Sequence, residues 1–396
     1  MLRHAYSPNP FVAVRHGPDP YSNAQRALEA LTLPPLRGKR VLLKPNAGRH
    51  VEPEKGITTH PAVVAAACDF FTRAGATVAV GESTIIGVKP LECLESTGIA
   101  AVVRERGLAL LDLDQRPARK TPIAGGAILA HLMVCGAIAE FDYVVSIPVM
   151  KTHMHCGVSL SLKNMKGCLR GREKVRLHQL PQPAESSLEK TPEKTLDLAI
   201  ADLAGVLAPD LALIDGTIGM QGLGPSAGSQ KRMDLVVAGT DYLAADAVAA
   251  TLMGFAPAAV PHLRLAAARC GGCIDVERLM IDPVEWRAWI SPFEPPPTKL
   301  SMEFKGVTLL DKETCSACMS TLLLFLQYHY AEIADYLPLT VALGKGHTLI
   351  PPGAVCVGNC AVRAAVKHIS VRGCPPVASE ILKVLKQHHP PGRARR

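Results

Sequence analysis

Four cysteines in the last part of the chain have the residue type and spacing of a metal or cluster site. Cys315 and Cys318 form a C-x-x-C pair in DKETCSAC, Cys360 lies in VCVGNCA, and Cys374 lies in VRGCPP. Four thiolates that converge on one point can hold a [4Fe–4S] cluster, and the same four can hold zinc. Spacing alone does not choose between the two metals. We predict that sulfur atoms from three separate segments meet around one inorganic centre.

The residues beside these cysteines predict how each thiol is positioned. An apolar stretch follows Cys318, so the C-x-x-C pair is expected at a helix start, where free backbone N–H groups face the negative charge of a cluster. Gly358 and Gly373 would let the backbone approach the sulfur atoms closely. Pro375 cannot donate to a strand ladder, which places Cys374 at a strand end.

The other cysteines are assigned mainly to the core. Cys356 lies inside a predicted strand and is the alternative to Cys360 as the fourth ligand. The CGGC sequence at residues 270–273 follows a predicted helix and is expected to end it. Three further cysteines lie in apolar elements and are expected to pack there: Cys68, Cys93 and Cys135. The N-terminal residues contain no continuous apolar run, which predicts a cytoplasmic protein with reduced thiols.

A second chemically active stretch is KTHMHCGVSLSLKNMKGCLRGREK at residues 151–174. Its clustered lysines are costly to hold together unless an anion neutralises them, and each positive charge lowers the pKa of its neighbours. Such a site could bind a phosphate or carboxylate, or act as acid or base. The alternative is a solvated basic face with one buried histidine. Zinc at His153, His155 and Cys156 is also conceivable, but no fourth ligand is obvious nearby.

The elements that must position these residues alternate between strand and helix. This alternation predicts an α/β fold of mostly parallel sheets flanked by helices, with a smaller C-terminal α/β domain. Ligands of such sheets bind beyond the carboxyl ends of the strands. Five polar residues fall at predicted strand ends: Lys44, Asn46, Glu82, Lys151 and His153.

Other segments carry weaker predictions. FDYVVSIPVMKTH at 141–153 is expected as one strand, residues 88–106 as helix, and GMQGLGPSAGS at 219–229 as a loop. The Pro-rich segment 286–300 is predicted to separate a domain over residues 1–290 from one over residues 300–396.

The net charge of +8 is concentrated in two places. Residues 163–178 hold six Lys or Arg and one Glu, and the last four residues hold three Arg. A nucleic-acid coat would be broader, so the compact basic segment favours a small anionic ligand or a docking patch. No apolar run is long enough to cross a bilayer. We therefore expect neither nucleic acid nor membrane as a partner.

The first part of the chain resembles the family called domain of unknown function 362. The resemblance covers about residues 10–285 and rests on VLLKPN, VAVGEST, VVSIPVMKTHMHCGVSLSLKNMKGC, LALIDGTIGMQGLGPSAG and GTDYLAADAVAATLMG. Members of that family are often described as iron–sulfur proteins, commonly with an added ferredoxin-like cysteine segment. The resemblance implies a site formed by Lys151, His153, Lys163 and Asn164. A C-x-x-C-x-x-C-x-x-x-C-P run is absent from the chain, so a standard ferredoxin segment is not expected.

The cysteine segments resemble the cluster-binding half of the small subunit of nickel–iron hydrogenases and its relative in respiratory complex I. There too a C-x-x-C opens a helix, a G-x-C-A follows a strand, and G-C-P-P closes another strand. The resemblance implies that Cys315, Cys318, Cys360 and Cys374 hold one [4Fe–4S] cluster, with zinc as the alternative.

These observations predict an iron–sulfur protein with redox chemistry, in which the basic site binds an anionic substrate or cofactor and a partner protein exchanges electrons. A first alternative is a non-redox enzyme whose cluster or zinc is structural. A second is an electron carrier or docking subunit that has no small-molecule site.

Overall fold

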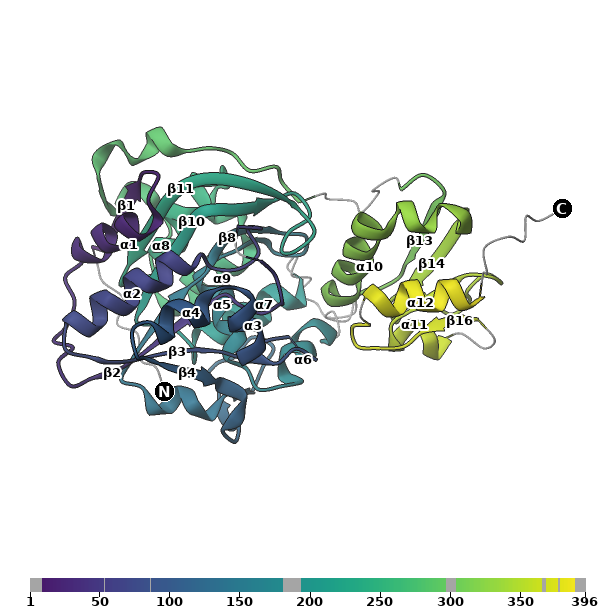
Figure 1. The fold of residues 1–396 in the computed structure, drawn as a ribbon, viewed down its shortest axis with the longest axis horizontal. Coiled ribbons are helices and arrows are strands. Elements are labelled where there is room, and N and C mark those ends of the chain that lie inside the picture. The colour runs from purple at the N-terminus through teal and green to yellow at the C-terminus, as the bar shows by residue number, and fades with distance from the viewer. Residues whose placement is uncertain are drawn as a thin grey trace. The chain divides into compact units, whose positions relative to one another are not determined.

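The computed structural model describes residues 9–52, 54–85, 87–180, 194–296, 304–364, 368–376 and 378–388. The chain forms two compact units, Met1–Pro296 and Pro297–Arg396, which can be followed by colour in Figure 1. Each unit is a sheet with helices packed on it, so the predicted α/β fold class is confirmed.

The first unit is built on a ten-stranded sheet. Its strands are β1 (Phe11–His16), β2 (Arg40–Pro45), β3 (Thr77–Glu82), β4 (Ala109–Asp112), β7 (Tyr143–Ile147), β8 (Val149–His153), β9 (Gly157–Ser159), β10 (Leu211–Gln221), β11 (Ser229–Gly239) and β12 (Met280–Asp282). Eight of them follow the order β12-β1-β11-β10-β7-β2-β3-β4, while β8 pairs with β10 and β9 pairs with β8. The run from β10 through β7, β2 and β3 to β4 is parallel, which brings the carboxyl ends of β2, β3 and β7 to one edge. A separate hairpin joins β5 (Arg119–Pro122) to β6 (His131–Val134).

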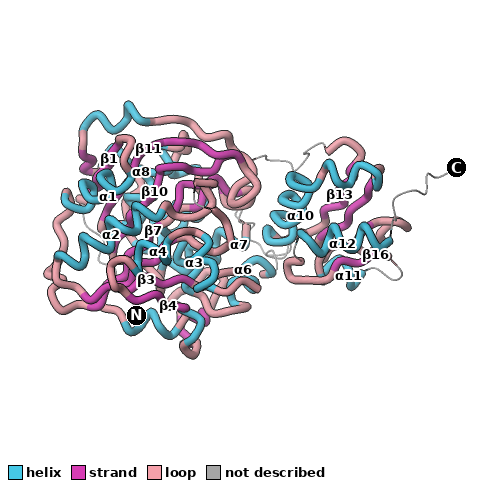
Figure 2. The backbone as a smooth tube through the Cα atoms, viewed as in Figure 1, coloured by secondary structure: helices cyan, strands magenta, loops and turns pink. Residues whose placement is uncertain are grey.

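Helices cover both faces of this sheet. They are α1 (Pro20–Glu29), α2 (Pro61–Arg73), α3 (Pro90–Ser96), α4 (Ile99–Arg104), α5 (Ser161–Asn164), α6 (Glu173–Gln179), α7 (Thr195–Ala204), α8 (Tyr242–Leu252) and α9 (Pro261–Cys270). Short 3₁₀ turns occupy Leu113–Gln115, Gly136–Glu140, Met165–Cys168, Pro257–Ala259, Val276–Arg278 and Val284–Trp289. Figure 2 shows these helices in cyan around the magenta strands.

The two faces of the sheet support two separate hydrophobic cores. Alternate residues of a strand point to opposite faces: Val41 and Leu43 of β2 pack in one core, and Leu42 packs in the other. Helices α1, α2 and α4 bury their apolar side chains in the first core, and α7, α8 and α9 in the second. Burial on both faces explains why the central strands read as continuous apolar runs.

Residues 141–153 form two strands where one was predicted. Pro148 separates β7 from β8, because proline has no N–H to donate to the ladder. Its carbonyl still accepts the Asp215 N–H at 2.8 Å. The change of pairing carries the chain from its ladder with β2 to a second ladder with β10 and β9. The interruption therefore sets where Lys151 and His153 lie.

Two other predicted elements also differ from the structure. The glycine-rich segment is shorter as a loop than predicted, because β10 continues to Gln221 and β11 begins at Ser229. A side chain at Gly219 would come within 2.7 Å of the Met150 carbonyl oxygen, so the glycine permits this close strand approach. The helix predicted over 88–106 divides at Gly98, whose φ of 74° is left-handed.

The second unit has a four-stranded parallel sheet of β13 (Val307–Asp311), β14 (Leu339–Leu343), β15 (Val355–Val357) and β16 (Ile369–Val371), in that order. Its helices are α10 (Ser316–His329), α11 (Asn359–Ala364) and α12 (Ala378–His388), with a 3₁₀ segment at Ala331–Tyr336. Helices α10 and α12 pack against each other. Cys356 is fully buried in a cluster with Ala342, Ala354 and Ala361, which confirms the predicted core position.

Candidate functional site

A buried ion pair joins the carboxyl ends of β2 and β3. The Lys44 ammonium lies 2.7 Å from the nearer Glu82 carboxylate oxygen, and both side chains are almost fully buried. Lys44 also donates to the Pro45 carbonyl at 2.9 Å. Glu82 accepts the N–H groups of Ala47 and Ser83 at 3.0 and 2.8 Å. Both charges are thus compensated, as burial requires.

The helical segment after β9 packs directly on this pair. Asn164 accepts from Lys44 Nζ at 3.2 Å and donates to the Lys44 carbonyl and the Ser146 hydroxyl, both at 3.1 Å. A side chain on Gly167 would lie 2.7 Å from Lys44 Nζ and 2.9 Å from Glu82 Oε1. Glycine at 167 is therefore required for the segment to approach the ion pair this closely.

Asp246 of α8 anchors the same segment from the other side. Its carboxylate accepts the backbone N–H groups of Ser161 and Leu162 at 2.7 and 2.9 Å. Burial raises the pKa of Asp246 to about 7, although these two N–H donors oppose the shift. Sequence reasoning missed this residue, because it lies in an alanine-rich helix far along the chain and carries no local signal.

Lys151 is as deeply placed as Lys44 but has no carboxylate partner. It is 5% exposed, and its Nζ donates to Asn46 Oδ1 and, at 2.7 Å, to the Ile57 carbonyl. Burial and, after it, the positive charges of Lys163, Arg49 and Lys44 together lower the pKa of Lys151 to about 7. Lys151 is therefore a lysine whose pKa is lowered in part by neighbouring cations, as the clustered lysines of the sequence predict.

His153 lies two residues further along β8. It is 3% exposed, and its Nδ1 accepts the backbone N–H of His155 at 3.1 Å. Burial lowers its pKa well below the usual value, and the charge of Lys163 contributes next. The imidazole is consequently neutral at physiological pH and is available for hydrogen bonding.

Lys163 and Arg49 complete the group of cations. Both are half-buried, and within the described part of the chain neither forms a hydrogen bond or an ion pair with a protein group. Burial lowers the pKa of each. Asp197 is the acidic residue whose charge acts on Lys163, but it lies 3.6 Å from the His262 ring. Arg49 was not predicted, although it lies five residues after Lys44 on the loop that leaves a strand end.

The structure therefore brings together the residues predicted from strand ends and from the 151–174 stretch. Lys44, Glu82 and Asn164 form one hydrogen-bonded set. Lys151 and Asn46 form another hydrogen bond beside it. We call the four side chains of Arg49, Lys151, His153 and Lys163 the cationic site. As far as the described residues show, the Arg49 and Lys163 side chains are unpaired and Lys151 has only neutral partners, which is an arrangement suited to an anion.

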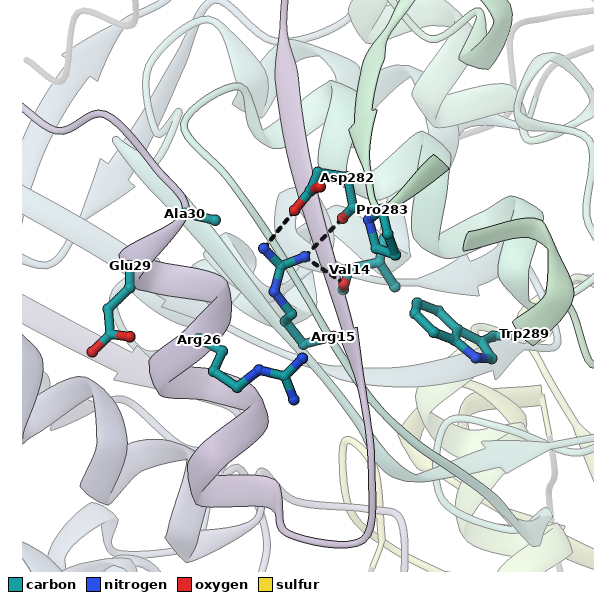
Figure 3. Close-up of a pocket in the computed structure, with 8 residues that line it drawn as sticks. All are labelled: Val14, Arg15, Arg26, Glu29, Ala30, Asp282, Pro283 and Trp289. Carbon is teal, nitrogen blue, oxygen red and sulfur yellow. Dashed lines mark hydrogen bonds and ion pairs between the residues drawn. The ribbon is translucent and has the colours of Figure 1, made fainter. Parts of the chain in front are cut away.

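A separate cavity of about 440 Å³ lies beside β1 and the end of α1. Figure 3 shows Arg15 pointing into it between Asp282 and Val14. The Arg15 guanidinium donates to the Asp282 carboxylate at 2.5 Å and to the carbonyls of Asp282 and Val14 at 3.0 and 2.9 Å. No predicted site residue lines this cavity.

Four of the five cysteines of the second unit are the predicted ligands, and they lie at the starts of α10 and α11 and after β16. Cys315 is the N-cap residue of α10, Cys360 lies in the first turn of α11, and Cys374 follows β16. The pKa of the Cys318 thiol is raised, first by its hydrogen bond with Cys315, then by burial and by the charges of Cys374 and Cys360. The thiols of the other three predicted ligands therefore all act on Cys318.

Backbone hydrogen bonds join two of the cysteine segments. The Asn359 N–H donates to the Gly373 carbonyl at 2.9 Å, and the Gly373 N–H donates to Asn359 Oδ1 at 3.0 Å. A side chain at Gly358 would lie 2.9 Å from Cys318 Sγ, so this glycine gives the thiol its space. No cysteine forms a disulfide. Among the described residues, there is no group of three or more His, Cys, Asp or Glu side chains that is spaced to hold a metal ion.

Comparison with known proteins adds three findings. The family described as domain of unknown function 362 matches residues 41–251. A thylakoid-associated protein of Synechocystis sp. is 27% identical over 226 residues, which are 57% of this chain and just under two thirds, 66%, of the relative. The lactate racemase apoprotein of Thermoanaerobacterium thermosaccharolyticum superimposes with a TM-score of 0.39 and 11% identity, over 88% of this chain and 70% of that chain.

Across the described residues, no helix is both long enough and apolar enough to cross a bilayer.

Proposed function

The chain belongs to the family of the domain of unknown function 362, and from this premise we propose that it is an iron–sulfur protein whose core binds an anionic small molecule. The proposal has two parts, one for each compact unit. The cationic site would hold the anion, and Cys315, Cys318, Cys360 and Cys374 would hold a [4Fe–4S] cluster.

The anion site rests on one observation. Among the described residues, the Arg49 and Lys163 side chains have no hydrogen-bond or ion-pair partner, and their charges act on the buried Lys151, which has only neutral acceptors. A buried or half-buried charge is stable only when an opposite charge or hydrogen bonds replace its water. Glu82 cannot supply that charge, because Lys44 and two backbone N–H groups already occupy it. An oxyanion would meet this need, since guanidinium and ammonium groups form short, charge-assisted hydrogen bonds to it.

We expect small oxyanions to stabilise the full-length protein against unfolding. An anion at one hundred times its dissociation constant adds about 2.7 kcal/mol, which a thermal unfolding assay with sulfate or oxalate at matched ionic strength would measure. Replacing Lys163 with methionine should weaken binding by about 10- to 100-fold, because a hydrogen bond to a charged group contributes about 1.5–3 kcal/mol.

Lys55→Met is the matched control, since it removes the same charge from an exposed side chain that is 53% accessible. If sulfate and oxalate stabilise the protein no more than chloride does, the cationic site is not an anion site. Equal loss of binding in Lys163→Met and Lys55→Met would instead indicate a general charge effect.

The cluster proposal is supported by the donor set and by its surroundings. Cys315 and Cys374 act electrostatically on both Cys318 and Cys360. The start of α10 has no side-chain cap, and the first backbone N–H groups of a helix favour a negative charge. A [4Fe–4S] cluster held there would supply one-electron transfer. Zinc remains the alternative metal for the same thiolates.

The remaining parts of the proposal concern partners and location. A redox-active cluster requires a partner protein that donates or accepts electrons, and reduced thiols agree with a cytoplasmic location. A structural cluster or zinc would make the protein a non-redox enzyme that uses Lys151 and His153. Anion binding separates both of these from an electron carrier without a small-molecule site, which would show none.

A further inference from the structure

Two buried lysines of the first unit have contrasting environments. Lys44 lies in β2 and Lys151 lies in β8, and the two residues are 1% and 5% exposed. Lys44 has the Glu82 carboxylate at 2.7 Å. Lys151 has the side-chain oxygen of Asn46 and the carbonyl oxygen of Ile57, neither of which carries a charge. At similar burial, Lys44 is therefore paired with a negative charge, whereas Lys151 has only uncharged hydrogen-bond acceptors.

Among the described residues, the charges that act most strongly on Lys151 are the positive charges of Lys163, Arg49 and Lys44 and the negative charge of Glu82. Lys163 approaches from α5, Arg49 from the loop after β2, and Lys44 from β2 itself. The strands paired with Lys151 contribute the uncharged residues Met220 of β10 and Ser159 of β9. Further along β10, the Asp215 carboxylate is held by the N–H groups of His60 and Thr217. A proton on Lys151 would add a further cation beside Lys163, Arg49 and Lys44, while the Glu82 carboxylate is already paired with Lys44.

We propose that Lys151 is uncharged when the cationic site is empty, and that it takes up one proton when a small, doubly charged oxyanion binds beside Arg49 and Lys163. This inference rests on the proposed anion site and specifies its regulation and ligand class. Binding is then coupled to proton uptake, because the anion supplies the negative charge that the ammonium form lacks.

The hydrogen bonds of Lys151 fit both states. A neutral amine has two N–H groups, which match the two acceptors Asn46 and Ile57 and leave its lone pair directed elsewhere. Protonation at that lone pair creates a third donor without disturbing the first two. The third N–H can then donate to the bound oxyanion. The depressed pKa of Lys151, about 7, agrees with this assignment.

The test measures proton uptake by calorimetry on the full-length protein, with sulfate and oxalate as separate probes. Neither anion titrates between pH 6 and 9, whereas phosphate would exchange protons itself. Titrations at pH 8 in buffers of different ionisation enthalpy should give about one proton taken up per anion, and those at pH 6 much less, since Lys151 is then already protonated. Between these conditions, affinity should fall by up to about tenfold per pH unit above pH 7.

Two variants assign the proton to Lys151. Lys151→Met should bind more weakly, with no uptake at pH 8, and Lys151→Arg should bind with no uptake because arginine stays protonated. Lys55→Met should behave as the wild type. Isotope-labelled lysine in the empty protein provides a second readout, in which one resonance titrates near pH 7 and is missing in Lys151→Met.

The outcomes separate this inference from the proposed function. Binding of sulfate or oxalate without proton uptake, or with a lysine resonance that titrates only near pH 10, overturns the inference and leaves the anion site standing. Failure of both anions to bind contradicts the anion site itself. Preference for tetrahedral sulfate or for planar oxalate identifies which oxyanion geometry the site accepts.

Discussion

Replacing Glu82 with glutamine should destabilise the first unit more than any other single exchange at the site. The change leaves the Lys44 ammonium buried without an opposite charge, although it keeps the size of the side chain. Removing one partner of a buried ion pair costs about 3–5 kcal/mol. Urea unfolding followed by circular dichroism would measure the loss as a shift of the transition of this unit.

An exposed pair of the same chemistry provides the control. Lys89 and Glu92 lie 2.5 Å apart on the surface, and Glu92→Gln should leave the unfolding transition almost unchanged. The double variant Lys44→Met with Glu82→Leu should recover part of the stability, because two apolar side chains leave no unpaired charge. If Glu82→Gln were no more destabilising than Glu92→Gln, Lys44 and Glu82 would not form the buried pair described above.

Replacing Cys318 with serine should abolish cluster binding altogether. Protein prepared without oxygen is expected to contain four iron and four sulfide per chain, which is the content of one [4Fe–4S] cluster. The cluster needs all four thiolates, and Cys318 is the thiol on which the other three act. Metal and sulfide analysis of Cys318→Ser should find almost none. Visible absorbance would follow the same loss.

Cys356→Ser is the internal control for this prediction. Cys356 is fully buried among Ala342, Ala354 and Ala361, so its exchange should lower stability slightly and leave the iron content unchanged. Loss of iron in Cys356→Ser with retention in Cys360→Ser would show that Cys356 is the fourth ligand. Zinc in place of iron and sulfide would establish the alternative metal.

Several parts of this architecture could be predicted from the sequence. Parallel strands share one carboxyl edge, so polar residues at strand ends are expected to meet, and Lys44, Glu82 and Asn46 do lie beside the 151–164 segment. The end of α9 at the CGGC sequence was also predicted, because a glycine that follows a helix readily adopts the left-handed conformation that ends it, as Gly271 does here. The core place of Cys356 followed from its position inside an apolar strand.

Other features depended on contacts that no local pattern records. The exchange of strand partners on the two sides of Pro148 and the long β10–β11 hairpin both depend on the register between strands far apart in sequence. Asp246 reaches Ser161 and Leu162 from a helix more than eighty positions away. Arg49 has the sequence context of an ordinary loop residue. Only the structure shows that its side chain has no hydrogen-bond or ion-pair partner among the described residues.

The most direct test of the anion site is a crystal structure of the protein grown with selenate, whose selenium marks the ligand by anomalous scattering. The account predicts one strong peak beside Lys151, with oxygen atoms about 3 Å from the side-chain nitrogen of Lys163 or of Arg49. Lys163 and Arg49 paired instead with carboxylates of the protein, and no selenium beside Lys151, would contradict it.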